Sequence, residues 1–188
     1  MNLPNTITLA RLILTAACFV LLELAGEGTA PESGPVWAAF WIFVIAAVSD
    51  FFDGWLARRN GQVTAFGRVA DPFVDKILIC GVLTCLLRFP VATAHVSTWM
   101  VVVILGREFL VTAVRGLAES EGVEFGADGL GKVKMVVQCC TAGALLTLVA
   151  GSTFWTPVAA WGIWATLILT VWSGVHYVWK ARGLLRAS

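Results

Sequence analysis

The sequence predicts an all-α fold, a polytopic membrane protein built as a bundle of six transmembrane helices. Hydrophobic residues make up 59% of its 188 residues and charged residues only 13%, and the mean hydropathy is +0.84. A soluble domain of this size could not bury so much apolar surface. Because a helix that spans a bilayer uses about 20 residues, six helices account for nearly the whole chain. We therefore expect residues 1–188 to form a single membrane domain.

The six helices are predicted from long apolar runs that end at glycine, proline or polar breaks. Gly26 to Pro35 separates the first run from the second, and Asn60 to Gln62 separates the second from the third. The later breaks are Arg88 to His95, the polar segment Arg115 to Lys134, and Gly151 to Pro157. The expected helices cover about 6–25, 35–59, 65–87, 96–117, 131–151 and 156–181.

The distribution of basic residues predicts the orientation, because cytoplasmic helix ends carry an excess of Lys and Arg. Of the 13 Lys and Arg, twelve lie at or toward one side of the predicted bundle, and only Arg88 falls on the other. Both termini are therefore expected in the cytoplasm. Five tryptophans near the outer helix ends suit the headgroup layer: Trp37, Trp41, Trp99, Trp155 and Trp161. The net charge of +1 gives no reason to expect a nucleic-acid partner.

Four aspartates fall within 26 residues, across the end of the second predicted helix and the start of the third: Asp50, Asp53, Asp71 and Asp75. At about 100° per residue, the first pair shares one side of its helix, and the second pair forms a stripe on the next. Since the connection is short, the two helices are expected to run antiparallel as neighbours with their acidic stripes facing each other.

Carboxylates gathered near a membrane repel one another, so a positive partner must offset them. Oxygen ligands without Cys or His favour Mg²⁺, Mn²⁺ or Ca²⁺, and four carboxylates can bridge two ions. Two such ions about 3.5–4 Å apart are a recurrent device for displacement at phosphorus. The substrate is then expected to be a phosphate ester or anhydride. The other interpretation is a belt of salt bridges with Arg58, Arg59, Arg68 and Lys76.

Small and basic residues accompany the aspartates at helical spacing. Gly54 and Ala57 lie on the carboxylate face of the second predicted helix and leave room for a ligand, and Gly67 does the same opposite them. Arg58, on the same side, is placed to hold phosphate.

Written out, Asp50 to Asp75 is DxxDGxxARx8GxxxDxxxD. The sequence here resembles the CDP-alcohol phosphatidyltransferase family, whose signature has these eight residues at this spacing. The resemblance implies a six-helix bundle, commonly a homodimer, with its site open to the cytoplasm and sideways to lipid. It implies that Asp50, Asp53, Asp71 and Asp75 bind two divalent cations, Mg²⁺ or Mn²⁺, and that Asp75 is the general base. The CDP portion would contact Gly54, Ala57, Arg58 and Gly67.

The signature leaves the acceptor alcohol open, since enzymes for inositol phosphate, serine, choline and glycerol phosphate share it. Three softer matches resemble bacterial members that use glycerol 3-phosphate: Asn2 to Arg11, Gly106 to Gly116 and Gly131 to Gln138. Met135 departs from many relatives, which have a small hydroxyl residue there. The resemblance implies phosphatidyl transfer from CDP-diacylglycerol to glycerol 3-phosphate, releasing phosphatidylglycerophosphate and CMP, at the cytoplasmic face of the cell inner membrane.

Basic residues later in the chain independently favour a phosphorylated acceptor. Arg107 lies inside an apolar run, Arg115 follows two turns later, and Lys132 and Lys134 open the next helix, which makes a candidate phosphate pocket. An arginine inside a span needs an anionic partner, and the neighbouring Glu108 is expected to point about 100° away. In the other interpretation Arg107 pairs with some acid, and the two lysines only follow the positive-inside pattern.

Three other functions stay open at this point. The chain could use another acceptor, such as inositol phosphate. It could be a metal-dependent CDP-lipid pyrophosphatase, which would release CMP with water as the acceptor. It could also be a divalent-cation carrier, although carriers often show repeats with broken helices at the membrane midplane, whereas this acidic cluster lies toward helix ends.

Overall fold

In the computed structural model, the chain forms six long helices and one short one over the residues that the structure describes, 3–27, 31–60, 65–121 and 129–182. Side chains are described except at 3–5, 50–72, 75 and 119. The helices are α1 (Leu3–Leu24), α2 (Ser33–Asn60), α3 (Ala65–Leu86), α4 (Pro90–Thr93), α5 (Thr98–Ser120), α6 (Gly129–Val149) and α7 (Thr156–Ala181). No strand occurs in these ranges, so the predicted all-α fold is confirmed.

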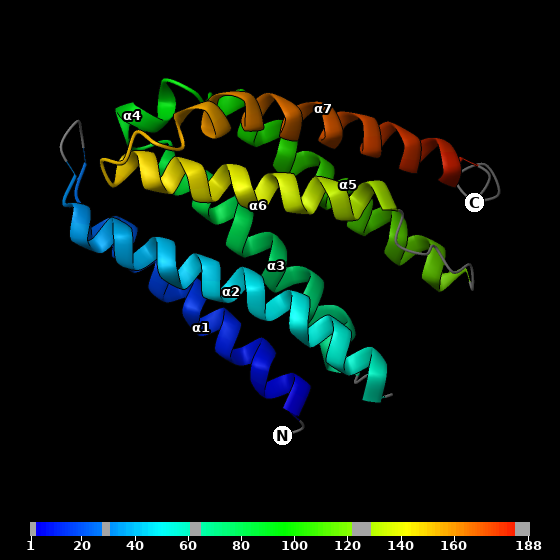
Figure 1. Ribbon diagram of the computed structural model, residues 1–188. Coiled ribbons are helices and arrows are strands. Elements are labelled where there is room, and N and C mark those ends of the chain that lie inside the picture. The colour runs from blue at the N-terminus through cyan, green and yellow to red at the C-terminus, as the bar shows by residue number, and fades with distance from the viewer. Residues whose placement is uncertain (1–2, 28–30, 61–64, 122–128, 183–188) are drawn as a thin grey trace.

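The helices pack as two groups that share one apolar core. α1 packs against α2 and α3, while α7 packs against α5 and α6. Contacts of α2 with α6, and of α3 with α5 and α6, join the two groups. Figure 1 shows the long helices running back and forth, with the ends of the chain on the side away from α4. The core between the groups is built from fully buried side chains such as Phe43, Leu83, Ile104 and Leu145.

The short helix α4 lies where the sequence predicts only a connection. Pro90 starts it, because a proline at the first helical position has its backbone angle already set and lacks an N–H that would go unused. Phe89, Ala92 and Val96 are fully buried, so this segment closes one end of the core. The other helix ends lie within a few residues of the predicted ones.

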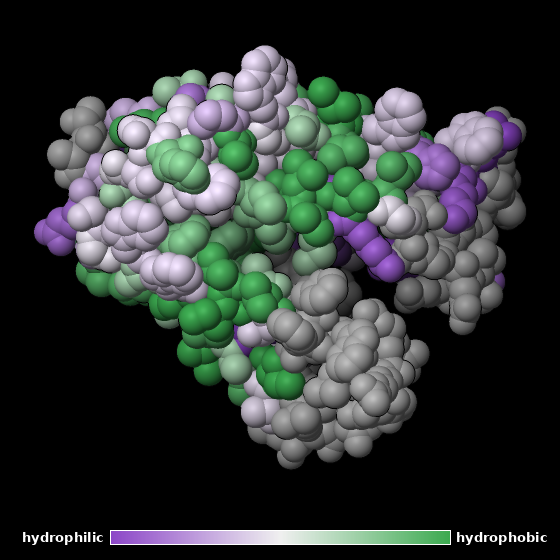
Figure 2. Space-filling view, viewed as in Figure 1, coloured by the Kyte–Doolittle hydropathy of each residue, from purple (hydrophilic) through white to green (hydrophobic). Residues whose placement is uncertain are grey.

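Three helical segments among the described residues are long and apolar enough to cross a membrane: Thr6–Leu24, Gly129–Val149 and Thr156–Ala181. Shorter apolar stretches cover Ser33–Ser49 and Lys76–Leu86. Large hydrophobic side chains remain exposed on several helices, and Figure 2 shows hydrophobic residues over much of the visible face of the described helices. The chain is therefore a membrane protein. Six spans, and cytoplasmic termini, stay predictions.

At the end of the bundle that carries α4, an ion-pair cluster joins the segment after α3 to the last turn of α1 and the residues that follow it. Arg88 donates hydrogen bonds to Glu23 and, at 2.8 Å, to Glu27. The basic residue that the sequence places apart from the other twelve is thus neutralised by two carboxylates. Trp99 and Trp155, also near this end, are about half exposed at 51% and 46%, as expected for a headgroup layer.

Two glycines allow close helix approach. A Cβ at Gly162 on α7 would lie 2.5 Å from Thr141 Oγ1 on α6, and a Cβ at Gly81 on α3 would lie 2.1 Å from the Phe19 ring on α1. Both distances are too short for real carbon contacts, so only glycine fits without movement of the neighbour. Gly162 thus lies at the packing interface of α6 and α7, and Gly81 at that of α1 and α3.

Candidate active site

The acidic residues occupy helical positions at the ends of α2 and α3 that adjoin each other in the chain. Asp50 and Asp53 lie in the second half of α2, and Asp71 and Asp75 in the first half of α3. Figure 1 shows α2 and α3 running antiparallel, and both pack mainly against α1 rather than against each other. The four carboxylate side chains lie outside the described ones, so the predicted facing of the two stripes stays a prediction.

The residues expected to contact CDP occupy the same two helix segments. Gly54, Ala57 and Arg58 follow Asp50 along α2, and Gly67 precedes Asp71 on α3. They also lie outside the described side chains. These residues nevertheless keep the helical spacing that the sequence predicts, because α2 continues without a break through Asn60 and α3 starts at Ala65.

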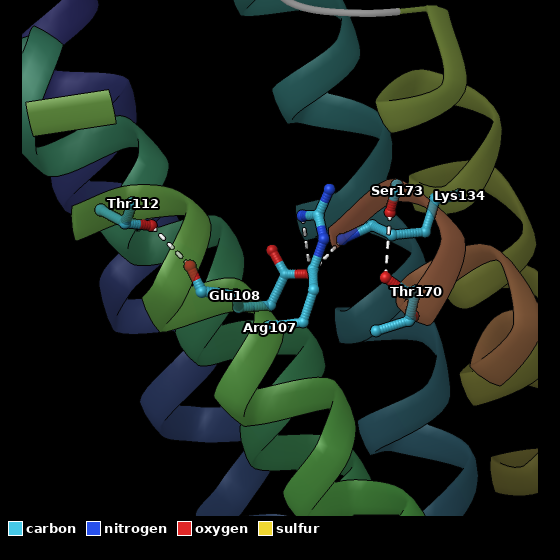
Figure 3. A network of polar contacts seen from close by, with 6 residues as sticks. All are labelled: Arg107, Glu108, Thr112, Lys134, Thr170 and Ser173. Atoms are coloured by element: carbon cyan, nitrogen blue, oxygen red, sulfur yellow. Dashed lines mark hydrogen bonds and ion pairs between the residues drawn. The ribbon is translucent and has the colours of Figure 1, made fainter. Parts of the chain in front are cut away.

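A buried charged cluster joins α5 and α6. Lys134 Nζ donates a hydrogen bond to Glu108 Oε1, and Arg107 Nη1 donates to the same oxygen at 3.3 Å. The three side chains expose only 6%, 10% and 12% of their surface for Lys134, Glu108 and Arg107. Figure 3 shows the two cationic groups converging on the Glu108 carboxylate. We call these three residues the charged cluster.

The pairing of Arg107 with Glu108 differs from the expectation that Glu108 points away. Adjacent helical residues do leave the helix about 100° apart, but both side chains are long enough to bend toward each other beside α6. Gly174 on α7 makes room for this, since a Cβ there would lie 3.1 Å from Arg107 Cγ. Arg107 therefore has its anionic partner inside the protein, as the alternative interpretation required.

Among the described side chains, the charged cluster carries an excess of one positive charge, because two cations share one carboxylate. Charges buried away from water are costly unless they are fully paired. Arg107 Nε and Gln138 Nε2 are also buried without a hydrogen-bond partner among the described residues. A buried net cation with unused N–H donors is the arrangement that binds a phosphate.

The other two predicted phosphate-binding residues lie apart from this pair. Arg115 Nε lies 3.4 Å from the hydroxyl of Tyr177 on α7, more than a turn beyond Arg107. Lys132 is exposed, two residues before Lys134 on α6. The structure therefore brings Arg107 and Lys134 together, while Arg115 and Lys132 lie nearer the helix ends.

Further buried polar residues lie near the charged cluster on α6 and α7. The sequence does not predict them as site residues. Lys134, Gln138 and Thr141 are spaced i, i+4 and i+7, and all three are buried. Thr166, Thr170 and Ser173 repeat that spacing on α7 and are buried too. The hydroxyls of Thr141 and Thr166 lie 3.3 Å apart. Two matching polar stripes in apolar helices are the sequence signal that could have revealed this interface.

The charged cluster lies close to the acidic helices. Lys76, which directly follows Asp75 on α3, lies within electrostatic range of Glu108, Arg107 and Arg115 on α5. α3 also packs against both α5 and α6. One end of the bundle thus combines four aspartate positions with a buried, net positive cluster, a combination suited to binding phosphate groups together with divalent cations.

Comparison with known proteins identifies the family of the chain. The sequence profile of the CDP-alcohol phosphatidyltransferase family matches residues 1–172. The chain belongs to that family. Curated relatives named CDP-diacylglycerol–glycerol-3-phosphate 3-phosphatidyltransferase include a protein of Bacillus subtilis (strain 168), 37% identical, with 100% of this chain and 98% of the relative aligned.

Two further relatives carry the same name. The protein of Rickettsia felis is 33% identical over 94% of this chain and 93% of its own length. The protein of Escherichia coli (strain K12) is 31% identical over 96% of this chain and 95% of its own length. The similarity therefore extends over both the acidic helices and the charged cluster.

Proposed function

We propose that this protein transfers the phosphatidyl group of CDP-diacylglycerol to glycerol 3-phosphate, giving phosphatidylglycerophosphate and CMP. The observation that carries the proposal is the buried charged cluster of Arg107, Glu108 and Lys134 beside the aspartate-bearing helix α3. The shared name of the relatives supports the choice of acceptor. Synthesis of this lipid is a step in phospholipid formation.

The four aspartates fit a pair of divalent cations by their chemistry. Asp50, Asp53, Asp71 and Asp75 supply oxygen ligands only, the donor type that Mg²⁺ and Mn²⁺ prefer. When bound, two such ions would neutralise the diphosphate of CDP-diacylglycerol and the charge that develops as CMP departs. Gly54, Ala57, Arg58 and Gly67 would leave space for, and contact, the CDP portion.

The acceptor would be held by its phosphate and deprotonated at its other end. Arg107 and Lys134 would bind the phosphate of glycerol 3-phosphate, with Arg115 and Lys132 contributing from the helix ends. Asp75 would take the proton of the 1-hydroxyl. That oxygen would form a bond to the phosphorus that carries diacylglycerol, and the bond from this phosphorus to the CMP oxygen would break. CMP would leave with the electron pair of that bond.

The substrate and the basic residues also indicate where in the cell the protein acts. CDP-diacylglycerol is a membrane lipid, so an enzyme that uses it must take the substrate from a leaflet and return the product there. The excess of basic residues on one side favours a site that faces the cytoplasm, in the cell inner membrane. We also propose a homodimer, as the family resemblance implies.

The proposal is tested by measuring CMP release with different acceptors. Detergent-purified protein is given CDP-diacylglycerol and Mg²⁺, and then either glycerol 3-phosphate, inositol phosphate, serine or no alcohol. We expect CMP release to depend on glycerol 3-phosphate. Release with another alcohol alone would refute the acceptor, and release without any alcohol would indicate a pyrophosphatase. Uptake of Mn²⁺ into vesicles without lipid substrate would indicate a carrier.

A further inference from the structure

A groove of about 570 Å³ runs between α5 and α7 on the outside of the bundle. Apolar side chains form most of its surface, among them Val103 and Leu110 from α5 and Val171, Val175 and Val178 from α7. Val171 and Val175 expose 49% and 65% of their surface. In a membrane protein, side chains exposed in this way face lipid rather than water.

Two arginines interrupt this apolar surface. Arg182 lies at one end, directly after α7, with its guanidinium 4.5 Å above the ring of Trp179. Arg107 contributes to the wall, and its Nε is buried without a hydrogen-bond partner among the described residues. The hydroxyl of Thr170, another lining residue, is also buried and unpartnered within that part of the chain. The Arg182 cation at one end of an apolar groove calls for an occupant that is anionic at that end and apolar along the rest.

The length of the groove fits one lipid. Arg182, just after α7, lies eleven residues beyond Val171, which is about 16 Å at 1.5 Å per residue. Half of a typical bilayer core is about 15 Å thick. The groove therefore matches the hydrocarbon thickness of one leaflet in length, with Arg182 and Trp179 at one end. An indole with a stacked guanidinium is suited to the headgroup layer.

We infer that the groove between α5 and α7 binds one anionic phospholipid of the bilayer. Its phosphate lies against Arg182 beside Trp179, and one acyl chain lies along Val171, Val175 and Val178. This site does not include the aspartates of the proposed catalytic site, although it shares Arg107 with it. The described residues that line the groove lie on α5, on α7 and at Arg182 just after α7, whereas the aspartates lie on α2 and α3. Arg107 lies between the two sites, because its stem lines the groove and its guanidinium binds Glu108.

The inference is tested by native mass spectrometry of the detergent-purified protein with dioleoylphosphatidylglycerol or dioleoylphosphatidylcholine, which share their acyl chains. We expect the protein to retain one phosphatidylglycerol at least fivefold more tightly than phosphatidylcholine, the contrast expected for one basic residue at a lipid headgroup. Arg182→Gln should remove this preference. Val175→Trp, which fills the groove at an exposed position, should abolish retention of both lipids.

Lys180→Gln is the matched control, because Lys180 is an exposed cation of the same helix end that does not line the groove; it should bind like the unaltered protein. Gel filtration and circular dichroism establish that each variant is folded. Equal retention of the two lipids by the unaltered protein, or unchanged binding by Arg182→Gln and Val175→Trp, would overturn the inference. Displacement of phosphatidylglycerol by equimolar CDP-diacylglycerol would also overturn it, since the groove would then belong to the substrate. The readout is binding, so it does not depend on the proposed reaction.

Discussion

Glu108 on α5 accepts a hydrogen bond from Lys134 on α6, and both side chains are buried. Arg107 binds the same carboxylate oxygen. In an apolar bundle, one carboxylate between two cations both links α5 to α6 through side chains and holds the cations in place. Under the proposed function, the positive charge left over among these three side chains would bind the phosphate of the acceptor.

Removal of the Glu108 carboxylate should therefore harm both stability and acceptor binding. We expect Glu108→Ala to lower the stability by about 3 kcal/mol or more, because it leaves two cations buried without a counter-ion. Glu108→Gln should be milder, since its amide oxygen can still accept from Lys134. Thermal unfolding in detergent compares the stabilities of the two variants with that of the original protein. Glu32→Gln, at an exposed site, is the control. A Glu108→Ala protein as stable as the original would contradict the buried pairing.

Buried Lys134 should matter more to the acceptor than exposed Lys132. We expect Lys134→Met to raise the KM for glycerol 3-phosphate about tenfold or more, the loss typical of a buried charge-assisted hydrogen bond. The KM for CDP-diacylglycerol should change little. Lys132→Met should have a smaller effect, because an exposed ammonium is well solvated and its interactions are screened. Equal effects of the two substitutions on the acceptor KM would argue against the charged cluster as the phosphate site.

Asp75 should be indispensable for turnover but not for folding. Asp75→Asn keeps the size of the side chain and removes its basicity, so CMP release should become undetectable while the folded yield stays near that of the original protein. Excess EDTA should likewise abolish activity, and Mg²⁺ or Mn²⁺ should restore it. Substantial residual transfer by Asp75→Asn would refute its role as the base, and activity in EDTA would refute the metal requirement.

The α6–α7 contact gives a stability test with an internal control. A methyl group at Gly162 would meet the buried Thr141, which already bonds to Val137 and Thr166, so Gly162→Ala should cost about 1–3 kcal/mol. Gly143→Ala on α6 would place its methyl group 3.7 Å from Phe40, an ordinary contact. That substitution should be neutral or stabilising, because alanine favours a helix. Melting temperatures in detergent compare the two, and the reverse order would contradict the packing.

Much of the fold could be predicted because apolar runs and glycine or proline breaks determine where membrane helices start and end. The long helices follow these runs closely. The helix α4 was missed because its burial depends on Phe89 packing into a core formed by distant segments. Local sequence carries no signal for such a contact.

The site could be predicted where it depends on spacing within one helix and less well where it depends on packing between helices. The aspartate positions and the chemistry they imply follow from i, i+4 patterns. The pairing of Glu108 with both Arg107 and Lys134 does not, because it requires a side chain of α6 to reach α5 and Gly174 on α7 to leave room. The polar stripes of Gln138 and Thr170 would have indicated that packing.

The most direct test of the proposed phosphatidyl transfer is to measure how much labelled glycerol 3-phosphate is incorporated into lipid. Purified protein is incubated with CDP-diacylglycerol, Mg²⁺ and radiolabelled glycerol 3-phosphate, and CMP is measured in the aqueous phase and label in the organic phase. We expect label to enter the lipid in a one-to-one ratio with CMP, as phosphatidylglycerophosphate. Release of CMP without label in the lipid would contradict the proposed transfer.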